Sequence, residues 1–173
     1  YPRLIPCLLV HENGLYKTTN FKNPKYVGDP INAVKIFNDK QVDELIVLDI
    51  DASVNNNEPN YKLIENLAFE CRMPLCYGGG IKTLDQALHI FSLGVEKISL
   101  SSEAVSNITL INSLSSRVGS QSVVVVIDVK KNRFTNQYKI FTHNGKIKTN
   151  KNLLEFINQL QDNGVGEIVI NSI

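Results

Sequence analysis

The chain has 173 residues, with 18 lysine and arginine residues against 17 aspartate and glutamate residues, and a formal net charge of +1. Its 43% hydrophobic and 20% charged residues are typical of a globular domain and argue against disorder. The balanced charge argues against a nucleic-acid-binding surface, and the longest apolar runs are too short to cross a bilayer. We therefore expect one domain over residues 1–173, with no nucleic-acid or membrane partner.

Three cysteines lie inside apolar segments, without CxxC spacing and without nearby histidine clusters: Cys7, Cys71 and Cys76. This pattern indicates buried free thiols in a reducing compartment rather than a disulfide framework. The first ten residues lack the features of a secretory signal. We expect a cytoplasmic protein that needs neither a metal nor another cofactor.

Short apolar runs alternate with longer helical patterns along the chain. Runs rich in Val, Ile and Leu predict strands buried on both faces at Leu4–Val10, Glu44–Ile50, Pro74–Gly78, Lys97–Ser101, Val123–Val129 and Glu167–Ser172. Apolar residues that recur every three to four positions predict helices at Pro30–Lys40, Tyr61–Glu70, Leu84–Leu93, Ile108–Leu114 and Leu153–Leu160. Gly94 and Gly164 are expected to end two of these helices.

Alternating strands and helices predict an α/β protein with a parallel sheet. A doubly wound sheet has the same alternation. Phosphate-type signals recur after successive strands, however, and this favours a (βα)8 TIM barrel. Such a barrel takes roughly 250 residues, so the chain accounts for about six βα units and strands seven and eight are missing. Two long insertions, 11–29 and 130–151, follow strands one and five; the second contains Asn144-Gly145, which predicts a hairpin turn.

Two segments that follow neighbouring strands predict a phosphate site. The triplet Gly78-Gly79-Gly80 lies between a strand and a helix, where glycine backbone and a helix amino end can both approach an anion. A tight turn is the structural alternative. Ser101 and Ser102 follow the next strand and could complete the same site, although an ordinary helix N-cap is also consistent with them.

Carboxylates end two of the predicted strands. Asp128 follows a five-residue apolar run, and in a barrel it would point into the catalytic mouth as a general acid or base. An N-cap or an ion pair with Lys130 or Lys131 is the structural alternative. Asp49 and Asp51 end strand two, and alternation directs one of two such carboxylates toward the helices.

Three histidines and one loop lysine remain. Lys17, in the first insertion, could contact a phosphate or lie in solvent. His11 and His143 lie in the insertions, and His89 is expected to be exposed on a helix. No carboxylate spacing around the histidines marks a metal site, and we predict none.

Several segments together resemble the HisF family, the cyclase subunit of imidazole glycerol phosphate synthase. They run in order over the whole chain: Arg3-Leu4-Ile5-Pro6-Cys7-Leu8, Gly28-Asp29-Pro30, Asp43-Glu44-Leu45, Leu48-Asp49-Ile50, Gly78-Gly79-Gly80-Ile81, Lys97-Ile98-Ser99 and Val126-Ile127-Asp128. The resemblance implies a TIM barrel of the ribulose-phosphate-binding type. It also implies a HisH-like glutaminase partner, forming a heterodimer, whose ammonia crosses the barrel to a phosphorylated sugar-aminoimidazole substrate.

The resemblance assigns roles to individual residues. It implies catalysis by Asp128. It implies phosphate or substrate binding by Lys17, Gly80, Ser101 and Ser102. We expect Asp49, Gly79 and Asn171 to take part in the same binding. It implies an ammonia gate at the base of the barrel, formed by Arg3, Glu44, Lys97 and Glu167. Without the family, these four would be charges at strand starts, paired because buried charges must be compensated.

One departure from the family pattern concerns catalysis. The family has its second catalytic aspartate where this chain has Leu9, and an aliphatic side chain cannot transfer a proton. The chain keeps the gate residues but lacks one member of the acid–base pair. In this combination it also resembles HisF-like paralogues that channel ammonia for amidation of a nucleotide-linked sugar in surface-polysaccharide synthesis. A HisA-like isomerase, which shares the glycine triplet, is a third alternative. The HisF cyclase of histidine biosynthesis is our main interpretation.

Overall fold

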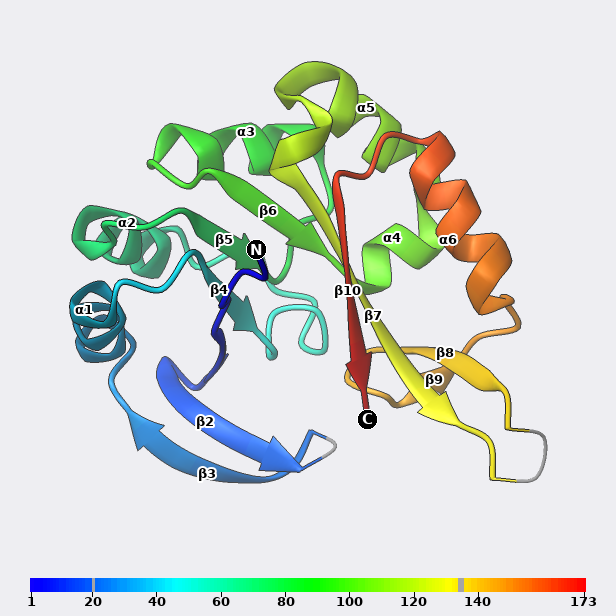
Figure 1. The fold of residues 1–173 in the computed structure, drawn as a ribbon, viewed down its shortest axis with the longest axis horizontal. Coiled ribbons are helices and arrows are strands. Elements are labelled where there is room, and N and C mark those ends of the chain that lie inside the picture. Colours follow the sequence, from blue (N-terminus) through cyan, green and yellow to red (C-terminus); the bar gives the residue numbers. More distant parts are fainter. Residues whose placement is uncertain (20, 134–135) are drawn as a thin grey trace. The chain divides into compact units, whose positions relative to one another are not determined.

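The computed structural model describes residues 1–19, 21–133 and 136–173, and these form two compact units. The first comprises residues 1–18 and 23–98, and the second comprises residues 19–22 and 99–173. Strand β6, Lys97–Leu100, begins in the first unit and ends in the second. The two units are drawn in one ribbon in Figure 1.

The first unit is built on parallel strands with helices between them. Strand β1 pairs in parallel with β4, and β4 pairs in parallel with β5. Helices α1 and α2 pack against each other, and Asn38 of α1 donates a 2.9 Å hydrogen bond to the carbonyl of Glu70. The elements are β1 (Cys7–His11), β2 (Gly14–Thr19), β3 (Lys22–Gly28), α1 (Pro30–Lys40), β4 (Leu45–Asp49), α2 (Tyr61–Glu70), β5 (Leu75–Gly78) and α3 (Leu84–Ser92).

The second unit is built on two long parallel strands, with an antiparallel hairpin beside one of them. Strand β7 pairs in parallel with β10, in the register Asp128 opposite Asn171, and pairs antiparallel with β8. Helix α5 packs against β7 and helix α6 against β8. The elements are α4 (Ser102–Ser106), α5 (Ile108–Val118), a 3-10 turn (Ser120–Ser122), β7 (Val123–Lys131), β8 (Tyr138–Thr142), β9 (Ile147–Lys148), α6 (Leu153–Asp162) and β10 (Glu167–Ser172).

Short polar side chains begin the helices at the predicted positions. Asp29 accepts a 3.0 Å hydrogen bond from the amide of Asn32, with Pro30 at the first helical position. The helices α1 and α2 have the predicted bounds, and α3, α5 and α6 differ from the prediction only at their ends. Gly94 and Gly164 follow α3 and α6 with φ of 100° and 82°, so both predicted helix ends are confirmed.

The hydrophobic core follows the predicted strands. The side chains of Val123–Ile127 are all buried, as are Leu45, Val47 and Tyr77 in the first unit. These strands contact packed side chains on both faces, which confirms the interpretation of their unbroken apolar runs.

The first strand and the first insertion differ from the prediction. Strand β1 begins at Cys7 and not at Leu4. The amide of Leu4 donates to the side chain of Asp43, and the Leu4 side chain is 66% exposed. The insertion after β1 contains two further strands, β2 and β3, which are neighbours in the sheet. The second insertion forms the predicted hairpin, since β8 pairs with β9 around the turn at Asn144-Gly145.

The prediction that all three thiols are buried was wrong. Cys7 is exposed and Cys71 is half-buried, and only Cys76 is buried; all three are free. Cys7 opens strand β1, which borders a groove described below, and this position leaves its side chain uncovered.

Candidate functional site

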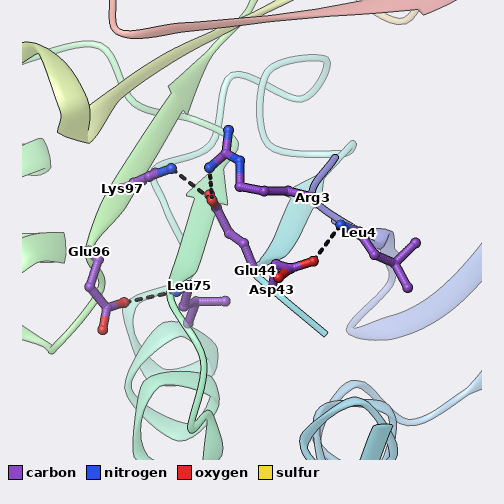
Figure 2. Close-up of polar contacts among 7 residues, drawn as sticks. All are labelled: Arg3, Leu4, Asp43, Glu44, Leu75, Glu96 and Lys97. Carbon is purple, nitrogen blue, oxygen red and sulfur yellow. Dashed lines mark hydrogen bonds and ion pairs between the residues drawn. The ribbon is translucent and has the colours of Figure 1, made fainter. Parts of the chain in front are cut away.

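A cluster of charges, here called the basal ion cluster, joins the starts of three strands in the first unit. It consists of Arg3, Glu44 and Lys97 (Figure 2). Arg3 precedes β1, Glu44 precedes β4 and Lys97 begins β6. Glu44 Oε2 accepts a 3.2 Å contact from Arg3 Nη1 and a 2.7 Å contact from Lys97 Nζ. The side chain of Glu44 is 3% exposed and that of Lys97 is 14% exposed. The predicted pairing of these three charges is therefore confirmed.

Backbone hydrogen bonds fix the strand starts that carry this cluster. The amide of Leu4 donates to Asp43 Oδ2 over 2.6 Å, and the amide of Asp43 donates to the carbonyl of Leu4 over 3.1 Å. Glu96 Oε2 accepts a 2.9 Å hydrogen bond from the amide of Leu75, as Figure 2 shows. These bonds place Arg3, Glu44 and Lys97 by holding the residue next to each of them.

One oxygen of the basal ion cluster has no hydrogen-bond partner among the described residues. Glu44 Oε1 is buried without a hydrogen bond, although Oε2 of the same carboxylate accepts two. A buried acceptor of this kind costs free energy unless it has a transient ligand. The fourth predicted gate residue, Glu167, begins β10 in the second unit. Its membership of the gate stays a prediction.

The glycine triplet ends β5 and is required by close packing. Gly79 has φ of 131° and Gly80 has φ of 74°. A Cβ atom on Gly79 would lie 2.6 Å from the carbonyl oxygen of Asp49, and one on Gly80 would lie 2.8 Å from that of Asn57. The triplet therefore allows the end of β4 and the following turn to approach the end of β5.

The helix after the triplet offers an anion fewer donors than the sequence pattern suggested. Thr83 Oγ1 accepts from the amide of Gln86, and Gln86 Oε1 accepts from the amides of Lys82 and Thr83. This capping box occupies three amides near the amino end of α3. The amides of the glycine segment itself are therefore the expected phosphate ligands.

We predict that Gly79→Ala destabilises the protein by about 1–3 kcal/mol, because it places a Cβ against the backbone of Asp49 at a positive φ. Gly94→Ala is the matched control. Gly94 also has a positive φ, of 100°, but a Cβ there would lie an ordinary 3.6 Å from Ala68. Urea unfolding of both variants measures the difference. Equal losses for the two would contradict the packing argument.

The predicted serine pair lies in the second unit. Ser101 precedes α4 and makes no side-chain cap, and Ser102 Oγ accepts a 3.0 Å hydrogen bond from the amide of His143. Ser102 thus ties α4 to the turn after β8. The N-cap alternative for Ser101 is not borne out, and the joint phosphate site with Gly79 and Gly80 stays a prediction.

Asp128 lies on β7 and is 4% exposed. Asn171, opposite it on β10, donates a 2.7 Å hydrogen bond from Nδ2 to Asp128 Oδ1. Burial raises the pKa of Asp128, while the hydrogen bond from Asn171 and the charge of Lys130 lower it. Lys130 itself lies over the ring of Phe141, 4.5 Å from its centroid. Asp128 is therefore a buried, oriented carboxyl group suited to proton transfer.

Asn171 was predicted to bind substrate, and the structure gives it a contact with Asp128. We predict that Asn171→Ala raises the pKa of Asp128, because the hydrogen bond that stabilises its charged form is lost. If the carboxylate is the active form, the acidic limb of the pH–rate profile of kcat/KM then moves to higher pH. An unchanged limb in Asn171→Ala would show that the limb belongs to another group.

Lys17 lies on strand β2 and not in a loop, so that part of the prediction was wrong. The run Gly14–Thr19 forms a strand because it pairs with β1 in the register Val10 opposite Leu15. Lys17 and Leu9 both line an open groove of about 570 Å³ between β1, β2 and α1. The family's missing aspartate and its mouth lysine thus border the same groove, and the role of Lys17 toward a ligand stays a prediction.

Asp49 and Asp51 have different tasks at the end of β4. Asp49 Oδ1 accepts hydrogen bonds of 3.0 and 3.1 Å from the amides of Asp51 and Ala52, which caps the turn. Burial raises the pKa of Asp49 and these two hydrogen bonds lower it. Asp51 instead contacts His11, with 2.7 Å between Asp51 Oδ1 and His11 Nδ1. No sequence pattern predicted this pair, although alternation along β1 could have placed His11 on the face of Leu9.

Other classes of site are absent from the described part of the chain. Residues 1–19, 21–133 and 136–173 contain no group of three or more His, Cys, Asp and Glu side chains that could hold a metal ion. In the same residues, no helix is long and apolar enough to cross a membrane. His89 is exposed, as predicted, and stacks on Tyr61 with 4.4 Å between the ring centroids.

The chain is similar to known proteins over almost its entire length. A family model described as histidine biosynthesis protein matches residues 3–173. Provisionally named imidazole glycerol phosphate synthase HisF subunits of Leptospira borgpetersenii and Vibrio vulnificus (strain YJ016) are each 57% identical, over 99% of this chain and over 68% and 66% of their own lengths. The imidazole glycerol phosphate synthase subunit HisF of Helicobacter hepaticus is 36% identical, over 99% of this chain and 68% of its own. The chain thus spans about two thirds of these relatives, and it belongs to the histidine biosynthesis protein family, among the HisF proteins.

Proposed function

We propose that the protein is the synthase subunit of imidazole glycerol phosphate synthase, a lyase within a glutamine amidotransferase complex. In this role it takes ammonia from a glutaminase subunit and joins it to a phosphorylated sugar-aminoimidazole substrate. The single observation that carries the proposal is the basal ion cluster, with Glu44 buried between Arg3 and Lys97. The names of the relatives support the same activity.

The basal ion cluster is costly unless it has a function. Removing two or three charged groups from water costs several kcal/mol for each ion, and hydrophobic residues of similar volume often stabilise a protein as well or better. A cluster at the amino ends of strands lies far from the carboxyl ends where barrel chemistry takes place. We infer that it serves passage of a small polar molecule, and that Glu44 Oε1 accepts N–H hydrogen bonds from ammonia as it passes.

Asp128 supplies the acid–base chemistry in this proposal. Ring closure with ammonia requires protons to be removed from nitrogen and delivered to a leaving oxygen, and a carboxyl group whose pKa is raised by burial can act as base and as acid in these transfers. Asn171 fixes the orientation of Asp128 through Oδ1 and leaves Oδ2 for the substrate. The amides at Gly79 and Gly80 and the hydroxyls of Ser101 and Ser102 are the proposed ligands of one phosphate.

The partner and the compartment follow from this chemistry. Ammonia in the cell is mostly ammonium, which is not a nucleophile, so a glutaminase subunit that delivers ammonia directly is required. We propose a heterodimer with a HisH-like glutaminase that docks beside Arg3, Glu44 and Lys97. Three free cysteines among the described residues agree with a reducing cytoplasm.

The test uses the full-length protein with the glutaminase subunit encoded alongside it. Glutamine and the family's phosphorylated aminoimidazole substrate are supplied, and glutamate and imidazole glycerol phosphate are both measured. Equal amounts of glutamate and imidazole product support the proposed function. The absence of both complex formation and glutamate release would overturn it.

Leu9 favours a second function. Position 9 carries an aliphatic side chain where the family has a catalytic carboxylate, and the relatives at 57% identity carry only provisional names. A HisF-like paralogue that channels ammonia to a different acceptor, a nucleotide-linked sugar of surface polysaccharide, fits both observations. Glutamate release without imidazole product in the assay above would favour this paralogue over the cyclase. A HisA-like isomerase has no use for an ammonia path, and the basal ion cluster argues against it.

A further inference from the structure

We propose that His11 and Asp51 form a proton-transfer dyad at the carboxyl ends of β1 and β4, in which His11 Nε2 exchanges the proton with the substrate. The inference rests on the proposed function, because it gives the dyad the acid–base task for which Leu9 has no group. The pair joins two segments 40 residues apart in the sequence through a 2.7 Å contact between Nδ1 and Oδ1. Both side chains are about a quarter exposed, at 27% and 26%.

The contact with Asp51 sets the tautomer of His11. A carboxylate only accepts hydrogen bonds, so Nδ1 of a neutral ring must carry the hydrogen. Nε2 then bears the lone pair and is the basic atom. Among the described residues, no hydrogen-bond partner is found for Nε2, which leaves it available to a ligand. The same division of tasks, with one nitrogen held by a carboxylate and the other reactive, underlies acid–base histidines in general.

Contacts on two further sides hold the pair in place. The edge of the Tyr16 ring packs against the His11 ring, with 4.9 Å between centroids and 79° between planes. Asp51 is itself fixed, because Oδ2 accepts a 2.8 Å hydrogen bond from the amide of Glu12. Such fixed geometry lowers the entropic cost of proton transfer.

The dyad lies on the strand face of the missing carboxylate. Side chains alternate along β1, so Cys7, Leu9 and His11 point to one face. His11 is two residues beyond Leu9, which places it roughly 7 Å nearer the carboxyl end of the strand. In parallel α/β proteins of the barrel class, the carboxyl ends of the strands carry the chemistry. The dyad is therefore positioned to replace an acid–base group at position 9.

Two carboxyl groups from the end of β4 lie next to the ring of His11. The titratable side chains that face His11 are Asp51, Asp49 and Tyr16, of which the first two are carboxylates from the end of β4. The neutral ring keeps its hydrogen bond to Asp51, so the pair holds its geometry in both protonation states.

The proton-transfer step balances without a further reactant. When ammonia attacks an electrophilic carbon, the nitrogen lone pair forms the C–N bond and the π bond to oxygen breaks. The new nitrogen then carries a positive charge and one proton too many. His11 Nε2 takes that proton, and the imidazolium returns it to the oxygen, which becomes a hydroxyl group. When the nitrogen lone pair then forms the C=N bond and the C–O bond breaks, His11 Nε2 takes a second N–H proton and delivers it to the departing oxygen, which leaves as water. The dyad ends the cycle in its initial state.

A purely structural clamp is the competing explanation, and one substitution separates the two. In His11→Asn, the side-chain amide can still donate to Asp51, as Nδ1 does, but it has no basic nitrogen. A clamp therefore survives this change, while proton transfer does not. His89→Asn is the matched control, since His89 is exposed on α3 and stacks only on Tyr61.

The test uses the full-length protein with its glutaminase partner, and both glutamate and product are measured. We expect His11→Asn to lower product formation by about 10²-fold, with glutamate release and the urea midpoint unchanged. Adding Leu9→Asp to His11→Asn is expected to restore at least a tenth of the lost rate, because a carboxylate returns to the same strand face. Full product formation by His11→Asn would overturn the dyad while the proposed function stands.

A second measurement is independent of partner and substrate. Long-range ¹H–¹⁵N spectra of the protein alone report which ring nitrogen of His11 carries the hydrogen. We expect the Nδ1–H tautomer in the wild type and its loss in Asp51→Leu. A neutral His11 with the hydrogen on Nε2 would overturn the dyad. This result decides the question even if no glutaminase complex forms and the proposed function fails.

Discussion

Replacing Asp128 by asparagine is expected to lower product formation by about 10²–10⁴-fold, the range that positioned acid–base groups contribute. Asparagine has nearly the shape of aspartate and can keep a hydrogen bond with Asn171 after an amide rotation, but it cannot exchange a proton. Release of glutamate by the partner should persist, because Glu44 keeps its contacts with Arg3 and Lys97.

The assay for Asp128→Asn is the coupled measurement of glutamate and imidazole product at saturating glutamine. Asp39→Asn is the control, since Asp39 is an exposed carboxylate on α1. A parallel loss of glutamate release would mean that the substitution disturbs the fold or the complex. Product formation at more than a tenth of the wild-type rate would contradict an acid–base role for Asp128.

Glu44→Gln is expected to destabilise the protein by about 3 kcal/mol, because it removes the negative charge that the nearly buried ammonium group of Lys97 contacts at 2.7 Å. Arg3 contributes less to the loss, since its side chain is 49% exposed and regains water. Urea unfolding of the full-length protein measures the change in free energy.

The chain offers a matched control for Glu44→Gln. Glu65 and Lys62 form an exposed ion pair on α2 with a 2.9 Å contact, so Glu65→Gln removes the same charge from a pair in solvent. The expected cost there is about 0.3–0.5 kcal/mol, as for exposed pairs on helices. If the two glutamate substitutions cost the same, the basal ion cluster is not a buried electrostatic unit, and the ammonia argument built on it loses its basis.

The sequence predicted the α/β class, the (βα)8 barrel family and nearly every long element, for identifiable physical reasons. Strands such as Val123–Lys131 are buried on both faces and need an unbroken apolar run. The start of a helix such as Pro30–Lys40 is indicated in the sequence by a capping aspartate and a proline. The family match over residues 3–173, together with the relatives named HisF, confirms the HisF resemblance.

The errors lie where local pattern is weak and long-range pairing decides. Strands β2 and β3 were missed because Lys22–Gly28 is almost wholly exposed, so no buried face marks it as a strand. The exposure of Cys7 depends on what covers the start of β1, which no neighbouring residue in the sequence specifies.

The candidate site was predictable in its parts but not in its contacts. The HisF resemblance indicated Arg3, Glu44 and Lys97, and the structure pairs them on one oxygen. Asn171 was predicted as a ligand contact, but register with β7 gives it Asp128 as its partner. The pair of His11 and Asp51 needed the fold, because the turn after β4 must bend back toward the end of β1 before the two side chains can meet.

The reciprocal hydrogen bonds between Leu4 and Asp43 have a consequence for exchange with solvent. Neither residue belongs to a strand, yet the amide of each donates to the other residue. Their amide protons should therefore exchange with deuterium together, as one cooperative opening, and more slowly than those of neighbouring exposed residues. Opening of the segment that carries Arg3 would therefore separate Arg3 from Glu44 without disrupting any strand.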